Sequence, residues 1–145
     1  MSDPRPATPT RADFPVLEAV QTRWADNDQY GHANNVVYYA WFDTVVNGWL
    51  GRQVGDVTRL PALGVVVETS CRYLASVAFP DALTVGLGVE RLGERSVTYK
   101  LAVFREDADE PSAVGRFVHV YVDPDTRRPV AVPDAVQDAV RRLGG

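Results

Sequence analysis

The sequence predicts an α+β domain in which one long central helix is wrapped by a curved antiparallel sheet of five or six strands. The first observation is that residues 36–50 are apolar around most of a helical circumference, so a helix there must be buried on nearly all sides. The second is that four consecutive strand-like segments follow it, which is typical of an antiparallel sheet. A sheet that curls around the helix satisfies both observations.

The first half of the chain supplies a strand and then the helix. Residues 16–24 place apolar side chains on one parity, which indicates a strand. A polar segment follows, and Asn34 or Asn35 is a suitable N-cap for the helix. Asp43 and Asn47 are four residues apart on that helix, so their shared face is expected to meet solvent, a partner or a pocket.

The second half supplies the rest of the sheet and a closing helix. Strands are expected at residues 63–74, 82–92, 95–106 and 112–123, with Gly93 in a tight turn between the second and third. In the last strand the valines share one phase: Val114, Val118, Val120 and Val122. A short helix is expected to begin at Pro133 and to end at the two terminal glycines.

Length and composition indicate one globular domain over residues 14–145, preceded by a disordered tail over residues 1–13. Cys71 is the one cysteine, so a disulfide framework within the chain is excluded. The N-terminal residues lack an apolar signal segment, and no apolar run approaches the ~20 residues of a membrane helix. A cytoplasmic protein without membrane contact is therefore expected. The net charge of -4 argues against a nucleic-acid partner.

The segment DNDQYGHANN, residues 26–35, could bind a metal. It matches an EF-hand calcium loop at three positions, but Val37 stands where a bidentate glutamate is required. A transition-metal site could use Asp26, Asp28 and His32, but nothing in the sequence completes the ligand set. Neither metal site is favoured.

Structural and catalytic interpretations of the same segment fit better. Asp, Asn and Gly favour turns and helix caps, which accounts for Asp26 and Asn27. The beginning of a helix presents free N–H groups and a positive dipole end, which can hold a carbonyl oxygen as it gains negative charge. A carboxylate a few residues upstream can attack the carbonyl carbon or activate water, and Asp28 is placed for this role.

Residues 22–43, TRWADNDQYGHANNVVYYAWFD, resemble the signature of hotdog-fold acyl-CoA thioesterases of the 4-hydroxybenzoyl-CoA thioesterase-like branch. Segments 71–104 and 120–133 are similar too, so the resemblance covers roughly residues 16–133. It implies a long central helix wrapped by an antiparallel sheet, in agreement with the fold predicted above. It also implies a homodimer whose sheets join edge to edge, or a homotetramer, with active sites at the subunit boundary.

By position in the motif, the resemblance implies two catalytic groups: the Asp28 carboxylate, and the backbone N–H of Asn35, which would polarise the thioester carbonyl. Four substrate-binding residues are implied: Tyr30, His32, Asn34 and Tyr38. The implied reaction hydrolyses a CoA thioester to free CoA and a carboxylic acid, with Asp28 as nucleophile or general base and the helix N-terminus as oxyanion hole. The CoA thioester is the substrate, and no metal or other cofactor is expected.

The substrate and the reaction keep alternatives open. Hydroxybenzoyl-specific members usually carry an apolar pair after the glycine, where this chain has His32 and Ala33, so the acyl group is not named. The thioester could belong to CoA or to an acyl carrier protein, and no pair of arginines stands out for the CoA phosphates. An acyl-thioester dehydratase or hydratase could pair Asp28 with His32. A non-catalytic acyl-CoA binding protein could use the same fold.

Overall fold

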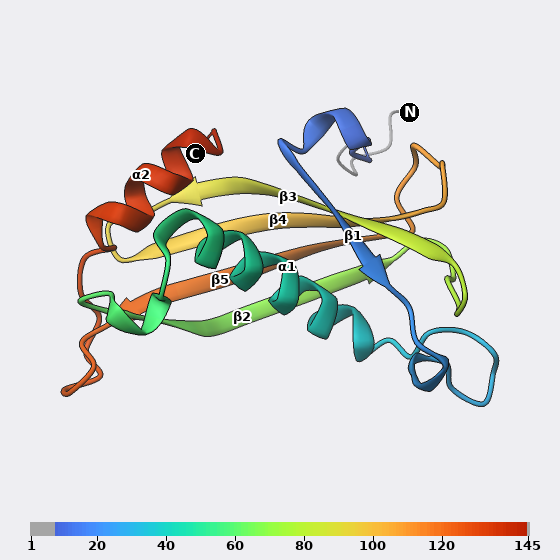
Figure 1. Cartoon of the computed structure of the whole chain (residues 1–145), viewed down its shortest axis with the longest axis horizontal. Helices are drawn as coiled ribbons and strands as arrows, with labels where there is room; N and C mark the ends of the chain where they lie inside the picture. Colours follow the sequence, from blue (N-terminus) through green and yellow to red (C-terminus); the bar gives the residue numbers. More distant parts are fainter. Residues whose placement is uncertain (1–7, 145) are drawn as a thin grey trace, which may run out of the picture.

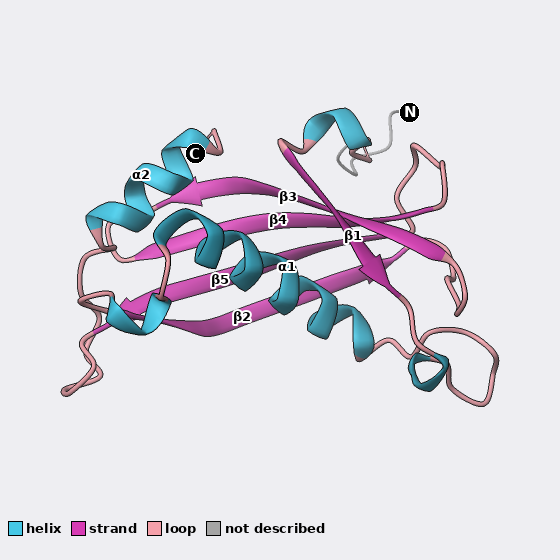
Figure 2. Cartoon of the chain, viewed as in Figure 1, coloured by secondary structure: helices cyan, strands magenta, loops and turns pink. Residues whose placement is uncertain are grey.

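A computed structural model describes residues 8–144 and confirms the predicted fold class (Figure 1). The sheet has five antiparallel strands in the order β1-β3-β4-β5-β2, so β1 and β2 are its edges. The long helix α1 lies across one face of this sheet, and α2 lies near one end of it (Figure 2). The elements are β1 Val16–Gln21, α1 Val37–Val54, β2 Leu63–Tyr73, β3 Ala82–Leu92, β4 Ser96–Arg105, β5 Ala113–Val122 and α2 Asp134–Arg142.

The later strands match the predicted segments to within one residue at each end, whereas the first strand is shorter than predicted. β1 ends at Gln21, and the chain then forms a 3-10 turn over Trp24–Asp26. The turn forms because the Asp26 carboxylate accepts hydrogen bonds from the Arg23 backbone N–H at 2.8 Å and from its guanidinium. Trp24 therefore leaves the strand, and its side chain is exposed instead of lying in the sheet.

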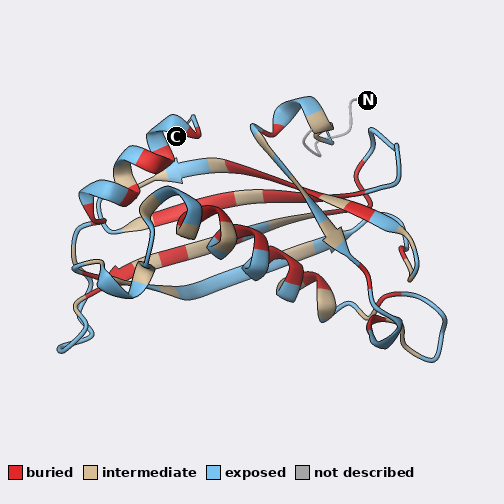
Figure 3. Cartoon of the chain, in the orientation of Figure 1, coloured by how far each residue is buried: buried red, intermediate tan, exposed pale blue. Residues whose placement is uncertain are grey.

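Helix α1 supplies the centre of the core, and its buried face packs against the concave side of the sheet (Figure 3). The predicted burial on nearly all sides is wrong, because one strip of the helix is exposed: Ala40, Asp43, Thr44 and Asn47. The expectation for Asp43 and Asn47 is confirmed, since both are exposed and the Asn47 amide donates to the Asp43 carboxylate at 2.9 Å. Among residues 8–144, no helix combines the length and apolar content that crossing a bilayer requires.

Strand β5 presents its aromatic residues to the helix. Val114, Val118, Val120 and Val122 share one face as expected; Val122 is buried, but the other three are only partly buried. The opposite face carries Phe117, His119 and Tyr121, which are all buried. Gly115 lies on the helix side too, where a Cβ atom would come within 2.4 Å of the Phe42 ring. Large rings thus fill the space under α1, and a glycine makes room for the ring that α1 inserts.

The N-terminal segment packs on the sheet before β1 begins. Of the predicted disordered tail, residues 1–7 lie outside the described residues. Residues 11–13 form a 3-10 helix, and the Arg11 guanidinium donates to the Ala108 carbonyl at 2.8 Å. Phe14 is buried, and its ring meets that of Phe104 edge-on at 6.0 Å. This segment therefore covers part of the sheet on the side away from α1.

Candidate active site

The loop before α1 folds into a tight turn around Asp28. The Asp28 N–H donates to the His32 carbonyl at 2.9 Å, and the Gly31 N–H donates to the Asp28 carbonyl at 3.0 Å. Gly31 has φ of 84°, a left-handed conformation that glycine adopts without strain. One carboxylate oxygen of Asp28, Oδ1, accepts the Tyr30 N–H at 2.9 Å. The other oxygen accepts no hydrogen bond from residues 8–144, so it is free to act on a ligand.

The two ends of this loop are held together by Asp26. Its carboxylate is fully buried, and it pairs with the Arg23 guanidinium at 2.7 Å. Its backbone carbonyl accepts the Asn34 N–H at 2.8 Å. The Asn27 side chain adds a further tie, since its Oδ1 accepts the Phe79 N–H at 3.0 Å. The loop is therefore fixed by buried polar contacts, and the residue before Asn35 has a defined position relative to Asp28.

Asn34 and Asn35 divide two roles at the beginning of α1. The Asn34 side-chain oxygen accepts the Val36 N–H at 3.0 Å, and the Asn34 carbonyl accepts the Val37 N–H at 3.0 Å. Asn34 thus satisfies two of the free donors that a helix N-terminus leaves. The Asn35 N–H donates to none of the described residues. It remains a free donor at the positive end of the helix dipole.

A pocket of about 380 Å³ brings most of the predicted site residues together. Asp28, His32, Asn35 and Tyr38 all line it. Tyr30 and Asn34 do not line it. Tyr30 is 79% exposed, and the Asn34 side chain accepts the Val36 N–H just before the helix. The predicted N-cap at Asn34 or Asn35 is wrong, because the N-cap position is Val36, which has no side-chain cap hydrogen bond. The arrangement places Asp28, which carries a carboxylate, and Asn35, which has a free N–H, around one space. A carbonyl compound bound there could be polarised at its oxygen and attacked at its carbon.

The pocket also contains residues that the sequence did not single out. Tyr73 and Ser76 come from the end of β2 and the loop after it. The Tyr73 hydroxyl donates to the Asn35 carbonyl at 2.9 Å, and its ring meets that of Tyr38 edge-on at 4.9 Å. No local pattern reveals this contact, since Tyr73 lies 38 residues from Asn35 along the chain. The only feature of the sequence that could have indicated Tyr73 is its position at the end of a predicted strand.

Burial controls the protonation of the tyrosines around the pocket. The pKa of the Tyr38 phenol is raised, mainly by burial. Burial also raises the pKa of Tyr73, with a further contribution from its hydrogen bond to Tyr39. Both phenols therefore stay neutral near pH 7 and can donate hydrogen bonds. This allows Tyr73 to fix the Asn35 peptide throughout the physiological range.

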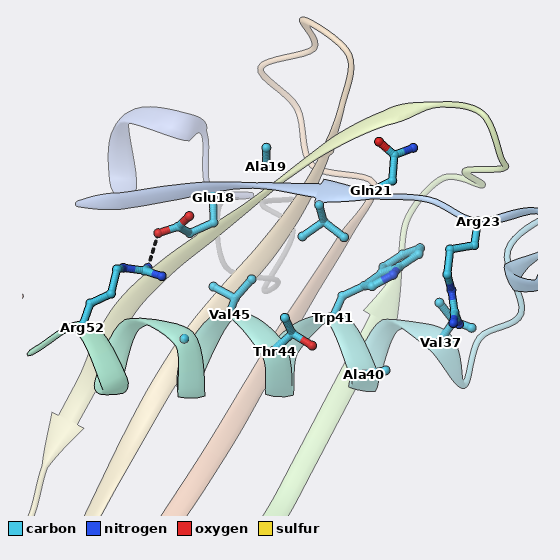
Figure 4. A pocket seen from close by; sticks show the side chains of 12 residues that line it. Glu18, Ala19, Gln21, Arg23, Val37, Ala40, Trp41, Thr44, Val45 and Arg52 are labelled. Carbon is cyan, nitrogen blue, oxygen red and sulfur yellow. Dashed lines mark hydrogen bonds and ion pairs between the residues drawn. The ribbon is translucent and has the colours of Figure 1, made fainter. Parts of the chain in front are cut away.

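A second cavity, of about 470 Å³, lies between β1 and α1 (Figure 4). We call it the β1–α1 slot, and its apolar lining includes Val20, Val37, Ala40, Trp41, Val45 and Gly48. Glu18 on β1 forms an ion pair with Arg52 on α1 at one end of the slot. Gly48 stands within the helix, where glycine costs about 1 kcal/mol relative to alanine.

The part of the chain that the structure describes contains no cluster of three or more His, Cys, Asp or Glu side chains suited to a metal ion. Asp28 and His32 share the site pocket, but Asp26 is committed to Arg23. The donor set proposed for a transition metal is therefore not assembled.

Comparison with known proteins places this geometry in a family context. A family model described as the thioesterase-like superfamily matches residues 22–140. The PA5185 protein of Pseudomonas aeruginosa is 48% identical, with a TM-score of 0.89 over 94% of this chain and 96% of that one. A thioesterase from Thermus thermophilus, crystallised with coenzyme A and zinc, is 27% identical, with a TM-score of 0.77 over 90% and 94%. The PA2801 protein of P. aeruginosa, a putative thioesterase, is 26% identical, with a TM-score of 0.79 over 86% and 96%.

Proposed function

The chain belongs to the thioesterase-like superfamily, thioester hydrolases on the hotdog fold, and from this premise we propose that it hydrolyses an acyl-CoA to free CoA and a carboxylic acid. One observation carries the proposal: Asp28 and Asn35 line one pocket, and one carboxylate oxygen of Asp28 and the backbone N–H of Asn35 have no hydrogen-bond partner among residues 8–144. The similarity to a thioesterase crystallised with coenzyme A supports CoA as the thiol. An acyl carrier protein thioester is the alternative substrate.

In the proposed reaction the Asn35 N–H donates to the thioester oxygen and stabilises the negative charge that forms on it. Asp28 then acts in one of two ways. As nucleophile it attacks the carbonyl carbon, expels the CoA thiolate and leaves an anhydride, which water hydrolyses. As general base it takes a proton from water as the water oxygen attacks the carbonyl carbon; the C–S bond then breaks, and the CoA thiolate leaves and takes up the proton from Asp28. Neither route needs a resident metal or redox cofactor.

The remaining predicted residues have supporting roles in this proposal. His32 and Tyr38 contact the bound thioester from the pocket wall, and Tyr73 fixes the Asn35 peptide. Asn34 acts indirectly, by shaping the helix N-terminus rather than by touching the substrate. Tyr30 supplies its backbone N–H to Asp28, which orients the carboxylate.

Asp28→Asn tests the proposal. The variant keeps the size and the acceptor oxygen of the side chain but loses its charge, so hydrolysis should fall by about 10²–10⁴-fold. Released thiol is measured over a panel of acyl-CoA substrates, and circular dichroism checks folding. Asp138→Asn, at an exposed position of α2, is the matched control and should keep the parent rate. Near-normal turnover by a folded Asp28→Asn variant would remove Asp28 from the mechanism.

A second reaction is favoured by one observation, namely that Asp28 and His32 line the same pocket. An acid and a histidine together can add water to an enoyl thioester or remove it from a hydroxyacyl thioester. Measuring hydration of an enoyl-CoA beside hydrolysis separates the two reactions. Hydration without thiol release would make the protein a hydratase.

We also propose that two copies of the chain pair through β2. This strand is a sheet edge, and Val66, Val67 and Leu74 on or beside it are exposed. Because Tyr73 and Leu74 line the site pocket, a partner strand added to β2 would complete the active site at a subunit boundary. A further pairing of dimers would give a tetramer. The cytoplasmic location expected from the sequence stays a prediction.

A further inference from the structure

The β1–α1 slot is a large cavity to which the proposed mechanism gives no role. Its walls are mostly hydrocarbon: Val20 of β1 lines it, and Trp41 and Val45 project toward it from α1 (Figure 4). Its volume lies within the ~300–1,000 Å³ typical of small-molecule pockets. The space is therefore suited to an apolar ligand group.

The charged residues around the slot are already neutralised. Arg52 pairs with Glu18, and Arg23 pairs with the buried carboxylate of Asp26. A ligand carboxylate or phosphate would have to compete with these ion pairs for a cation. The slot thus favours an uncharged ligand group over an anionic one.

Gly48 keeps the slot open at a cost to the helix. A Cβ atom added there would meet only the Arg52 guanidinium, at 3.4 Å, which is the end of a flexible side chain. Packing therefore does not require glycine at this position. Gly48 lines the slot, so a larger side chain at this position would take up part of its volume. Gly51, three residues later on the same helix, does not line the slot, and a Cβ atom there would meet nothing within 4 Å.

The slot begins beside the candidate active site. Val37, the first residue of α1, lines the slot, and Asn35 of the site pocket precedes it by two residues. The Trp41 ring in the slot packs on the Tyr38 ring of the site pocket, with centroids 4.9 Å apart. The site pocket itself is lined largely by polar groups, so it suits a thioester better than a hydrocarbon chain.

We infer that the β1–α1 slot binds the hydrocarbon chain of the acyl group, and that the preferred substrates carry an uncharged aliphatic chain. The inference rests on the proposed thioesterase function. The thioester lies at the first turn of α1, and the chain extends along the Ala40, Thr44 and Gly48 side of the helix. Filling this side should shorten the chains that the enzyme accepts.

Gly48→Leu tests the inference, with Gly51→Leu as the matched control on the same helix. The ratio of kcat/KM for dodecanoyl-CoA over acetyl-CoA should fall at least tenfold in Gly48→Leu. Gly51→Leu should keep the parent ratio. Ala40→Leu, at another lining position, should repeat the effect if Gly48→Leu fails to fold. An unchanged ratio in a folded slot-filling variant overturns the inference while leaving thiol release intact.

A binding measurement separates this inference from the proposed function. Dodecyl-CoA and ethyl-CoA thioethers cannot be hydrolysed, so calorimetry reports their binding alone. The parent protein should bind the dodecyl compound at least tenfold more tightly, and Gly48→Leu should abolish that preference. If the parent hydrolyses no thioester but shows this pattern, the inferred binding of the chain in the slot is supported and the proposed hydrolysis is contradicted. Equal binding of both thioethers by the parent contradicts the inference that the slot binds the chain.

Discussion

His119 is a buried histidine without a hydrogen-bond partner at Nδ1 among residues 8–144. Its imidazole lies on β5 and is packed against aromatic rings. The ring centroid of Phe117 is 5.1 Å away and that of Tyr99 is 6.0 Å away. Burial lowers the pKa of His119 to about 4, and the Asp43 carboxylate opposes this only in part. The native protein therefore holds this side chain neutral.

This burial should make stability depend on pH. An unfolded histidine has a pKa near 6.5, so the unfolded chain binds a proton before the native one does. The contribution of neutral His119 to the free energy of unfolding is fully present above about pH 6.5. It is lost as the pH falls toward 4, and the loss is roughly 3 kcal/mol in all. Urea unfolding at several pH values measures it. His119→Phe should flatten the curve over this range, whereas His32→Gln should keep it. A curve unchanged by His119→Phe would contradict the assignment.

At the scale of elements, α1 depends on the loop that precedes it. Its first donors are satisfied by Asn34, and the loop is fixed through Asp26 and Tyr73. The active-site donor, the Asn35 N–H, is thus placed by residues that do not touch the substrate. The free energy of unfolding and the turnover rate should therefore change together when the Asn34 side chain is replaced.

Asn34→Ala should lower the free energy of unfolding by about 1 kcal/mol, because the Val36 N–H loses its side-chain acceptor just before the helix. Turnover should fall as well, because the Asn35–Val36 peptide loses one of its two restraints and keeps only the hydrogen bond from Tyr73. Chemical denaturation and thiol release measure the two effects. Asn34→Asp keeps an acceptor oxygen and should restore both. Loss of turnover at full stability would instead indicate that Asn34 touches the substrate.

Several elements followed from the sequence because their cause is local. In β3 and β4, alternate apolar residues such as Val85 and Val103 join the core cluster with α1, as their alternation predicts, whereas Phe104 packs on Phe14 on the other face. β5 is different, because both of its faces carry apolar residues: valines on one and aromatic residues on the other. The sequence pattern does not say which face is buried, and in the structure the larger rings fill the core. Asp28, His32, Asn35 and Tyr38 meet because the segment is short. Tyr73 and the slot could not be predicted, since each depends on contacts between distant segments.

At the scale of the whole molecule, the sheet is protected unequally at its two edges. β1 curls toward α1 and is tied to it by the Glu18–Arg52 ion pair. β2 ends the sheet on the other side, where Val66 and Val67 are adjacent exposed apolar residues and Val67 is 57% exposed. An open apolar edge invites pairing with another strand. This asymmetry supports assembly through β2.

Val67→Lys should weaken that assembly. Each copy would bring a charge to the edge where the two strands meet, so the protein should shift from dimer or tetramer toward monomer. Sedimentation velocity measures the change. Hydrolysis should fall with dissociation, because the partner would no longer cover the pocket end at Leu74. Ala135→Lys adds the same charge on the exposed side of α2 and should leave the assembly unchanged. A parent that sediments as a monomer would refute the pairing.

The contact between Arg23 and Asp26 has a consequence for how this sequence can diverge. The carboxylate is fully enclosed, whereas the arginine side chain is 69% exposed and reaches in from the surface. Replacing Arg23 alone would leave the buried Asp26 carboxylate without its ion-pair partner, which destabilises the fold. Replacing both residues with uncharged ones would remove that destabilisation. Substitutions at positions 23 and 26 should therefore occur together in related sequences. An exposed arginine without a buried partner would tolerate substitution more readily.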